Sequence, residues 1–290
     1  MRTDGSRSYG ESAGVMLARA LADAGRYVFT VDDAVAAAPP GTSRARVCRL
    51  LKALSDAGWL LRLRRGLYAG TGRLPGGIDL PPFVVATALV TPSAISHWSA
   101  LAHHGFTDQV PVIVTASTPR KVVTPGMRHG AQAAERCTWT AADISIRYIT
   151  IVEERYRLGL ESVWLDEHFR VPMTDRERTV LDLFAMPRVF GGVATGLNVL
   201  EHAADDLDVG RLVGYGVRYG VVAVAKRLGW ALTATGVAEG DLAPLLAMPA
   251  SSAVPLDPGM PRRGRHDRHW MVIENLGGAP ASRADDEVRD

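Results

Sequence analysis

Hydrophobic residues recur at helical spacing three times near the start of the chain. The spacing i, i+3, i+4 and i+7 appears over residues 17–24, 31–38 and 47–54. This spacing places apolar side chains on one face of an α-helix. Glycine follows the first and third stretches and Pro39-Pro40 the second, and these residues end helices. We therefore predict three short amphipathic helices with a common core, the second of which begins with a capping box between Thr30 and Asp33.

A different pattern follows the third helix. Leu61 and Leu63 alternate with Arg62 and Arg64, and this period of two predicts a half-buried strand. Arg65-Gly66 suits a tight turn, after which residues 67–68 begin a return strand. Three helices followed by a basic hairpin are typical of a winged helix-turn-helix that binds DNA.

The polar face of the third predicted helix carries most of its positive charge. Thr42 or Ser43 is placed to cap its first turn. We expect the helix to present Arg46, Arg49 and Lys52 to a major groove, and the hairpin arginines to contact phosphates or an adjacent minor groove. The predicted DNA-binding residues are Thr42, Ser43, Arg44, Arg46, Arg49, Lys52, Arg62, Arg64 and Arg65. A basic face that only contacts solvent is the alternative.

Charge is concentrated in this part of the chain. Residues 40–75 contain eight basic residues and one acidic residue, a net charge of +7, whereas all 290 residues together have a net charge of +2. Focused positive charge is what neutralisation of DNA phosphates requires. The charge distribution therefore favours the DNA-binding interpretation.

The length of the chain allows two domains. We predict an α+β protein with an N-terminal winged helix-turn-helix at 1–75, a linker at 76–82 and a larger mixed α/β domain at 83–275. Residues 276–290 are polar, and we expect them to be disordered. Neither a membrane span nor a signal peptide is expected, and two distant cysteines fit a protein of the reducing cytoplasm.

Helices and strands alternate in the predicted C-terminal domain. Thr91-Pro92 is expected to open a helix that ends at Gly105, and Thr174 with Glu177 to form a capping box. The predicted strands span 110–117, 144–152, 161–172 and 269–274, and further helices span 193–205, 208–219 and 221–229. A loop with four arginines is predicted at 261–268.

Local motifs give little sign of catalysis. Adjacent His103 and His104 point to different sides of a helix and are poorly placed to chelate one metal. Asp205, Asp206 and Asp208 form an acidic cluster, which a solvated helix end explains better than a metal site. We expect no catalytic residue, no metal and no cofactor.

Four segments in a fixed order carry a family resemblance, over roughly residues 13–275. They are LRRGLY (63–68), ISHWSALAHHGF (95–106), MTDRERTVLDLF (173–184) and YGVRYGVVAVAKRLGW (215–230). In these segments the chain resembles the AbiEi antitoxins, which are repressors of bacterial type IV toxin–antitoxin systems. The resemblance implies a repressor that binds inverted repeats in its own promoter. It also implies a neighbouring nucleotidyltransferase-like toxin and a C-terminal domain with a part in antitoxicity.

A second hypothesis stays open beside this one. The C-terminal domain is then an enzyme or a ligand sensor that the N-terminal domain recruits to DNA. Metal-dependent chemistry would need clustered carboxylates, for which the Asp205–Asp208 segment is the candidate. The arginine loop at 261–268 departs from the family pattern and is a candidate second contact with nucleic acid.

Overall fold

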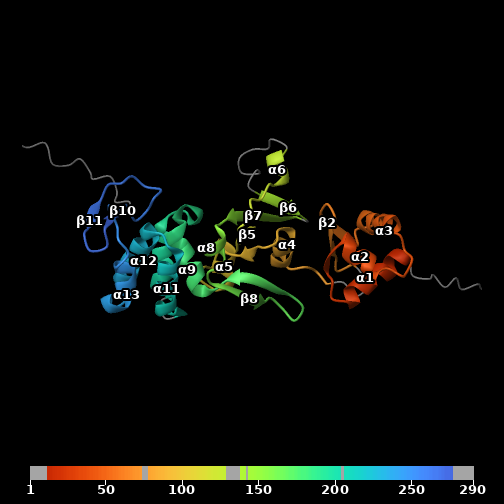
Figure 1. The fold of residues 1–290 in the computed structure, drawn as a ribbon, viewed down its shortest axis with the longest axis horizontal. Coiled ribbons are helices and arrows are strands. Elements are labelled where there is room, and N and C mark those ends of the chain that lie inside the picture. Colours follow the sequence, from red (N-terminus) through yellow and green to blue (C-terminus); the bar gives the residue numbers. More distant parts are fainter. Residues whose placement is uncertain (1–11, 74–77, 129–137, 142, 204–205, 277–290) are drawn as a thin grey trace, which may run out of the picture. The chain divides into compact units, whose positions relative to one another are not determined.

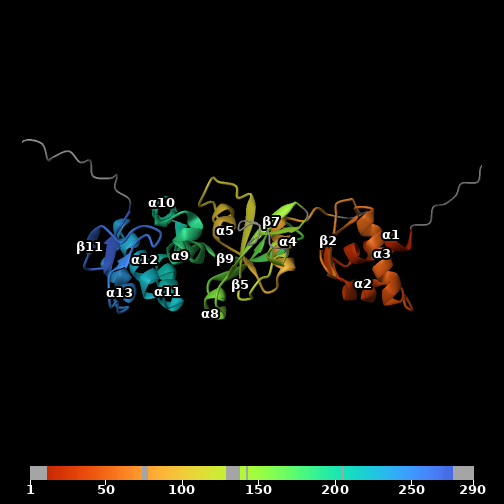
Figure 2. The same cartoon turned by 90° about the horizontal axis from the view of Figure 1, so that it is seen from above.

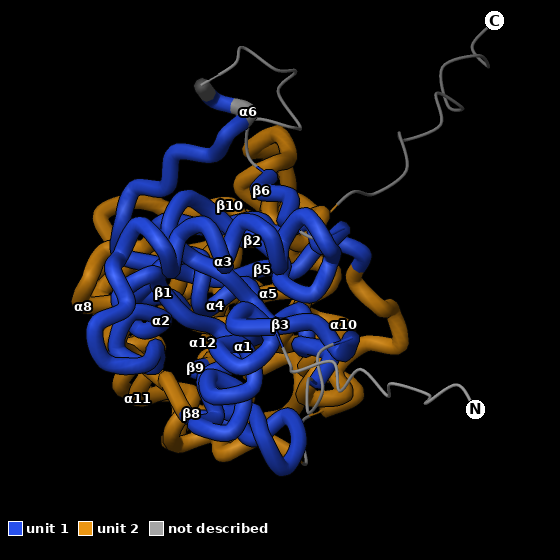
Figure 3. The backbone as a smooth tube through the Cα atoms, turned by 90° about the vertical axis from the view of Figure 1, so that its right-hand side faces the viewer, with its two compact units in different colours: residues 1–93, 112–150, 162–172 blue, residues 94–111, 151–161, 173–290 orange. Residues whose placement is uncertain are grey.

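The computed structural model describes residues 12–73, 78–128, 138–141, 143–203 and 206–276. The chain forms two compact units, and neither is continuous in sequence (Figure 3). Unit 1 comprises residues 1–93, 112–150 and 162–172, and unit 2 comprises residues 94–111, 151–161 and 173–290. Helices and strands occur in both, so the protein has the predicted mixed α+β fold. The predicted domain boundaries at 75 and 83 remain a prediction, and residues 277–290 lie outside the described residues.

Unit 1 begins with three helices and a small antiparallel sheet (Figures 1 and 2). The helices are α1 (Ala13–Asp23), α2 (Val31–Ala37) and α3 (Arg44–Asp56), and the strands are β1 (Val28–Thr30), β2 (Leu60–Arg64) and β3 (Leu67–Gly70). The strand order is β1-β3-β2. The apolar faces of the three helices meet in one core with Phe29 and Leu60. The predicted helices and hairpin are thus confirmed, and β1 is an addition that the sequence did not predict.

The rest of unit 1 contains a second group of strands. Strand β7 (Ile144–Thr150) pairs with β5 (Ile113–Thr118) in parallel and with β6 (Thr138–Ala141) antiparallel. Helix α4 (Pro82–Leu89) packs on these strands, where the Tyr148 hydroxyl donates a 2.6 Å hydrogen bond to the carbonyl of Ala86. A short helix, α6 (Pro125–Arg128), follows β5.

Unit 2 is mostly helical and is built around α9 (Arg176–Ala185), whose residues from Glu177 to Phe184 are all buried. Its other elements are β4 (Ala94–Ile95), α5 (His97–His103), α8 (Glu153–Tyr156), the 3-10 helix η1 (Pro187–Phe190), α10 (Val193–Ala203), α11 (Val209–Tyr219), α12 (Val222–Ala234), α13 (Glu239–Leu246), β10 (Val254–Pro255), β11 (Arg265–Asp267) and β12 (Val272–Glu274). The last three strands form a sheet in the order β10-β12-β11. Helix α13 was not predicted.

Three local predictions in residues 83–275 were wrong. Thr91-Pro92 does not open a helix: α5 begins at His97, because buried Ile95 pairs with Met173 in a sheet. The single strand predicted at 161–172 is two strands, β8 (Leu160–Trp164) and β9 (Arg170–Thr174). They are separated by a turn in which the Asp166 carboxylate accepts hydrogen bonds from the backbone N–H groups of residues 168 and 169.

The third error concerns the start of α9. Asp175, not Thr174, is its N-cap, and the Asp175 carboxylate accepts a 2.8 Å hydrogen bond from the Arg178 backbone N–H. Glu177 is turned away from the cap, and its carboxylate accepts a 3.0 Å hydrogen bond from the backbone N–H of Asp208.

Candidate nucleic-acid interface

Helix α3 is fixed by its cap and its apolar face. The Ser43 hydroxyl accepts a hydrogen bond from the Arg46 backbone N–H, as the N-cap prediction requires. Val47, Leu51 and Leu54 are buried on one side, and the opposite side of the helix is exposed. The cationic side chains of the helix therefore project from a surface that the core holds rigidly.

The predicted cations of α3 fall into two classes. Arg44 pairs with Asp32, and Lys52 pairs with Asp56 at 2.5 Å, although all four side chains are well exposed. Arg46 and Arg49 are exposed and have no ion-pair partner among the described residues. A free cation loses no protein contact when it binds a phosphate or a base, so the second class is better prepared for DNA.

The hairpin presents three more cations. Arg62, Arg64 and Arg65 are exposed and without an ion-pair partner in the described part of the chain. The pairing with β3 shifts register between Arg62 and Arg64, and Gly66 turns the chain with a φ of 79°. The turn thus carries adjacent arginines at its tip, as the wing hypothesis predicts.

The capping box predicted at the start of α2 is confirmed. The Asp33 backbone N–H donates to the Thr30 hydroxyl at 3.2 Å, and the Asp33 carboxylate accepts from the Thr30 backbone N–H at 2.8 Å. The hydrogen bonds from the Thr30 backbone and side chain lower the pKa of Asp33, and nearby Arg26 adds to this. Helix α2 packs against α3, so the cap helps to hold the cationic helix in place.

Thr42 and Arg46 also line a groove that the sequence did not indicate. With Leu50 they line a groove of about 370 Å³ whose other side is formed by α1, including exposed Met16. Cys48, which also lies on α3, is an exposed free cysteine.

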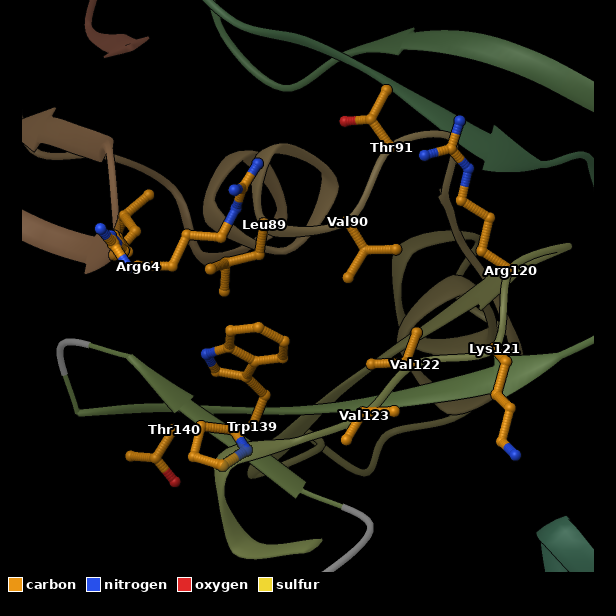
Figure 4. A pocket seen from close by; sticks show the side chains of 13 residues that line it. Arg64, Leu89, Val90, Thr91, Arg120, Lys121, Val122, Val123, Trp139 and Thr140 are labelled. Carbon is orange, nitrogen blue, oxygen red and sulfur yellow. The ribbon is translucent and has the colours of Figure 1, made fainter. Parts of the chain in front are cut away.

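A cationic pocket in unit 1 was missed by the sequence analysis. Arg64 and Arg65 line it together with Arg120, Lys121 and Trp139. Figure 4 shows Trp139 and apolar side chains between Arg64 on one side and Arg120 and Lys121 on the other. The only sequence signal was a pair of cations directly after a predicted strand, which by itself does not reveal a pocket.

Unit 2 contains a buried polar cluster that was also missed. Arg178 is 1% exposed and donates to the Asp182 carboxylate at 2.9 Å and to the backbone carbonyls of Leu158, at 2.8 Å, and Arg155. The Tyr215 hydroxyl donates to the Asp175 carboxylate at 2.7 Å, and burial with this contact raises the pKa of Tyr215 to about 12. The Arg178 and Asp182 side chains are almost fully buried, which leaves them no access to a large ligand, so we assign this ion pair to stability.

The acidic group considered for metal binding has other roles. Asp206 pairs with Arg176 at 3.1 Å, and Asp208 caps α11 by accepting from the Arg211 backbone N–H. Asp205 lies outside the described residues. Within the described ranges, no three metal-ligating side chains converge on one point. The same residues include no helix that is both long and apolar enough to cross a bilayer.

The arginine loop at 261–268 is only partly a loop, because Arg265–Asp267 forms β11. Its four arginines are exposed, and the Arg262 guanidinium donates to the Ala253 carbonyl at 2.7 Å. A role in binding nucleic acid remains a prediction.

Comparison with known proteins gives a family for one segment and a fold for most of the chain. The chain is similar to a crystal structure of the Rv2827c protein from Mycobacterium tuberculosis, with a TM-score of 0.59 and 17% identity over 90% of this chain and 91% of the other. At this identity the similarity shows the fold alone. No curated protein sequence matches. Residues 16–69, from α1 to β3, match the family of transcriptional regulators described as AbiEi antitoxins, so the resemblance inferred from the sequence is confirmed over that segment.

Proposed function

We propose that this protein is a transcriptional repressor and antitoxin, whose N-terminal module is a winged helix-turn-helix that binds repeats in the promoter of its own toxin–antitoxin operon. The observation that carries the proposal is a set of exposed arginines with no acidic partner among the described residues, on α3 and on the β2–β3 hairpin: Arg46, Arg49, Arg62, Arg64 and Arg65. The family match covers this same segment.

In the proposed complex α3 enters the major groove and the hairpin lies over the backbone beside it. Arg49 contacts base edges, because a guanidinium matches the two acceptors of guanine. Arg62, Arg64 and Arg65 contact phosphates and supply affinity for any sequence. The capped start of α2 and the buried face of α3 keep these cations in place.

The proposed role of the residues that follow the N-terminal module, 83–275, comes from the family resemblance. They take part in counteracting a nucleotidyltransferase-like toxin, and the protein itself is not an enzyme. A regulator of transcription acts where the chromosome is, so we propose a cytoplasmic location. The competing hypothesis, a ligand-sensing regulator, is favoured by one observation, the cationic pocket around Trp139.

Two substitutions test the proposed interface. The full-length protein and its Arg49→Ala and Arg64→Ala variants are titrated onto a duplex of the DNA upstream of the coding sequence. Arg49→Ala is expected to cost about 1–3 kcal/mol and to relax specificity at one base pair, and Arg64→Ala to weaken binding to all sequences. Arg218→Ala, an exposed arginine on α11, is the matched control. If both interface variants bind like the parent, the interface is misplaced.

A further inference from the structure

The cationic pocket of unit 1 has the composition of a ligand site. It has a volume of about 860 Å³, which lies in the range of about 300–1,000 Å³ found for small-molecule sites. Its lining joins four segments of unit 1: the hairpin, the end of α4 with the residues that follow, residues 120–125 and residues 139–140. Thirteen residues line it, and none is acidic.

Four cations and one aromatic ring define the chemistry of this pocket. Arg64, Arg65, Arg120 and Lys121 are exposed and have no carboxylate partner among the described residues. Trp139, on β6, is only half-buried, and its indole projects into the pocket toward Leu89 (Figure 4). A half-buried indole beside apolar side chains offers a flat surface for stacking, which a pure phosphate site does not need.

We propose that this pocket binds a nucleoside phosphate, with the base stacked on Trp139 and the phosphates held by the arginines and the lysine. Base–aromatic stacking and guanidinium–phosphate hydrogen bonds are the two interactions that the lining offers together. Neither an uncharged aromatic ligand nor a simple anion uses both. The four cations replace the metal ion that would otherwise neutralise a triphosphate.

The position of the pocket gives the ligand an effect on DNA. Arg64 and Arg65 line the pocket and also belong to the proposed DNA interface, so this consequence rests on the proposed function. A ligand that engages these arginines competes with DNA phosphates for them. Binding of the nucleotide therefore weakens binding of DNA, and by thermodynamic linkage DNA weakens binding of the nucleotide to the same extent. The protein then responds to the level of a nucleotide by releasing its promoter.

Calorimetric titration of the full-length protein with ATP, in buffer without divalent metal and without DNA, tests the site. We expect saturable binding with a dissociation constant below about 1 mM. The double variant Arg120→Ala/Lys121→Ala is expected to weaken it at least about tenfold, and Trp139→Leu about tenfold, with Trp139→Phe close to the parent. Melting curves of each variant show that it is folded, and Arg218→Ala is the control. Adenosine and inorganic triphosphate, each lacking half of the ligand, are expected to bind more weakly than ATP.

Two further outcomes separate this proposal from the proposed function. If ATP does not bind while the promoter duplex does, the nucleotide site is overturned and the DNA interface stands. If ATP binds equally to the parent and to the pocket variants, the nucleotide site is likewise overturned. If Arg120→Ala/Lys121→Ala weakens DNA binding and ATP has no effect, the pocket belongs to the DNA footprint and the proposal fails. ATP binding with no affinity for the duplex overturns the proposed function and leaves the pocket intact.

Discussion

Two exposed arginines, Arg49 on α3 and Arg64 on the hairpin, lie in surroundings opposite to those of Arg178 in the first turn of α9. Arg49 and Arg64 are exposed, and no carboxylate in the described part of the chain pairs with them. Arg178 is 1% exposed, and its guanidinium bonds to Asp182 and to two backbone carbonyls. An arginine is therefore available for binding only where the fold leaves its charge unsatisfied.

The largest effect on stability is expected from the removal of the Arg178 guanidinium. Arg178→Met leaves the buried Asp182 carboxylate without its cation, and we expect a loss of about 3–5 kcal/mol in the free energy of unfolding. Urea unfolding of the full-length protein measures it. The double variant Arg178→Met with Asp182→Leu is expected to recover much of the loss, because no buried charge is then left unpaired. Arg218→Ala is the exposed control, for which a change within about 0.5 kcal/mol is expected. An equal effect of Arg178→Met and Arg218→Ala would contradict the account.

Substitution of the exposed cations is expected to weaken DNA binding and to leave the stability of the fold nearly unchanged. Arg49→Ala should weaken DNA binding by about 1–3 kcal/mol and change the free energy of unfolding by no more than about 0.5 kcal/mol. Lys52→Ala should weaken DNA binding less, because Lys52 has to exchange Asp56 for a phosphate. Fluorescence anisotropy with the promoter duplex measures both. A larger effect of Lys52→Ala than of Arg49→Ala would show that an ion pair on α3 does not make its cation less available to DNA.

The cap of α2 is expected to affect stability rather than DNA binding, because Thr30 and Asp33 are not among the proposed DNA contacts. Asp33→Asn should cost about 1 kcal/mol of stability at pH 7. The hydrogen bonds to Thr30 lower the pKa of Asp33 from 3.8. The stabilisation is therefore present above pH 3.8 and is lost as the pH falls through the lower folded-state value. Thermal melts of parent and variant between pH 3 and 7 should converge at the acid end, and a constant difference would speak against the assignment.

The smallest effect is expected at His97, which is fully buried at the start of α5. Burial lowers the pKa of His97 below 6.5, so the folded protein holds it neutral. Its contribution to stability is complete above pH 6.5 and falls as the pH drops toward the folded-state value, because the unfolded chain then binds more protons. His97→Asn, which tolerates the positive φ of 56° at this position, should flatten the dependence of the melting temperature on pH below 6.5. An unchanged slope would assign the acid sensitivity to other groups.

Local periodicity was enough to predict the N-terminal elements. Helices α1 to α3, the β2–β3 hairpin and the box between Thr30 and Asp33 all follow from residues close in sequence. Strand β1 was missed because three residues have too little pattern, and its pairing with β3 defines it. The turn at Asp166 and the cap at Asp175 were missed because side chains of several neighbours compete for the same backbone groups.

Residues distant in sequence determine the features that the sequence did not predict. The pocket joins Arg64 to Arg120 and Trp139 across more than fifty residues of chain. The burial of Arg178 depends on carbonyls from α8 and from the turn that follows it. A pattern of charges along the chain locates cations, whereas only tertiary packing decides which of them remain free. The predicted interface on α3 and the hairpin is a consequence of local pattern, and it awaits a direct test.

The dependence of DNA affinity on salt shows whether the hairpin arginines bind DNA phosphates. The dissociation constant of the full-length protein for the promoter duplex is measured from low to moderate salt, for the parent and for the Arg64→Ala/Arg65→Ala variant. We expect a steep log–log slope for the parent and a slope smaller by about 0.9 for each phosphate contact removed. Tight binding with the same slope in both proteins would contradict this expectation, because the hairpin would then take no part in holding DNA.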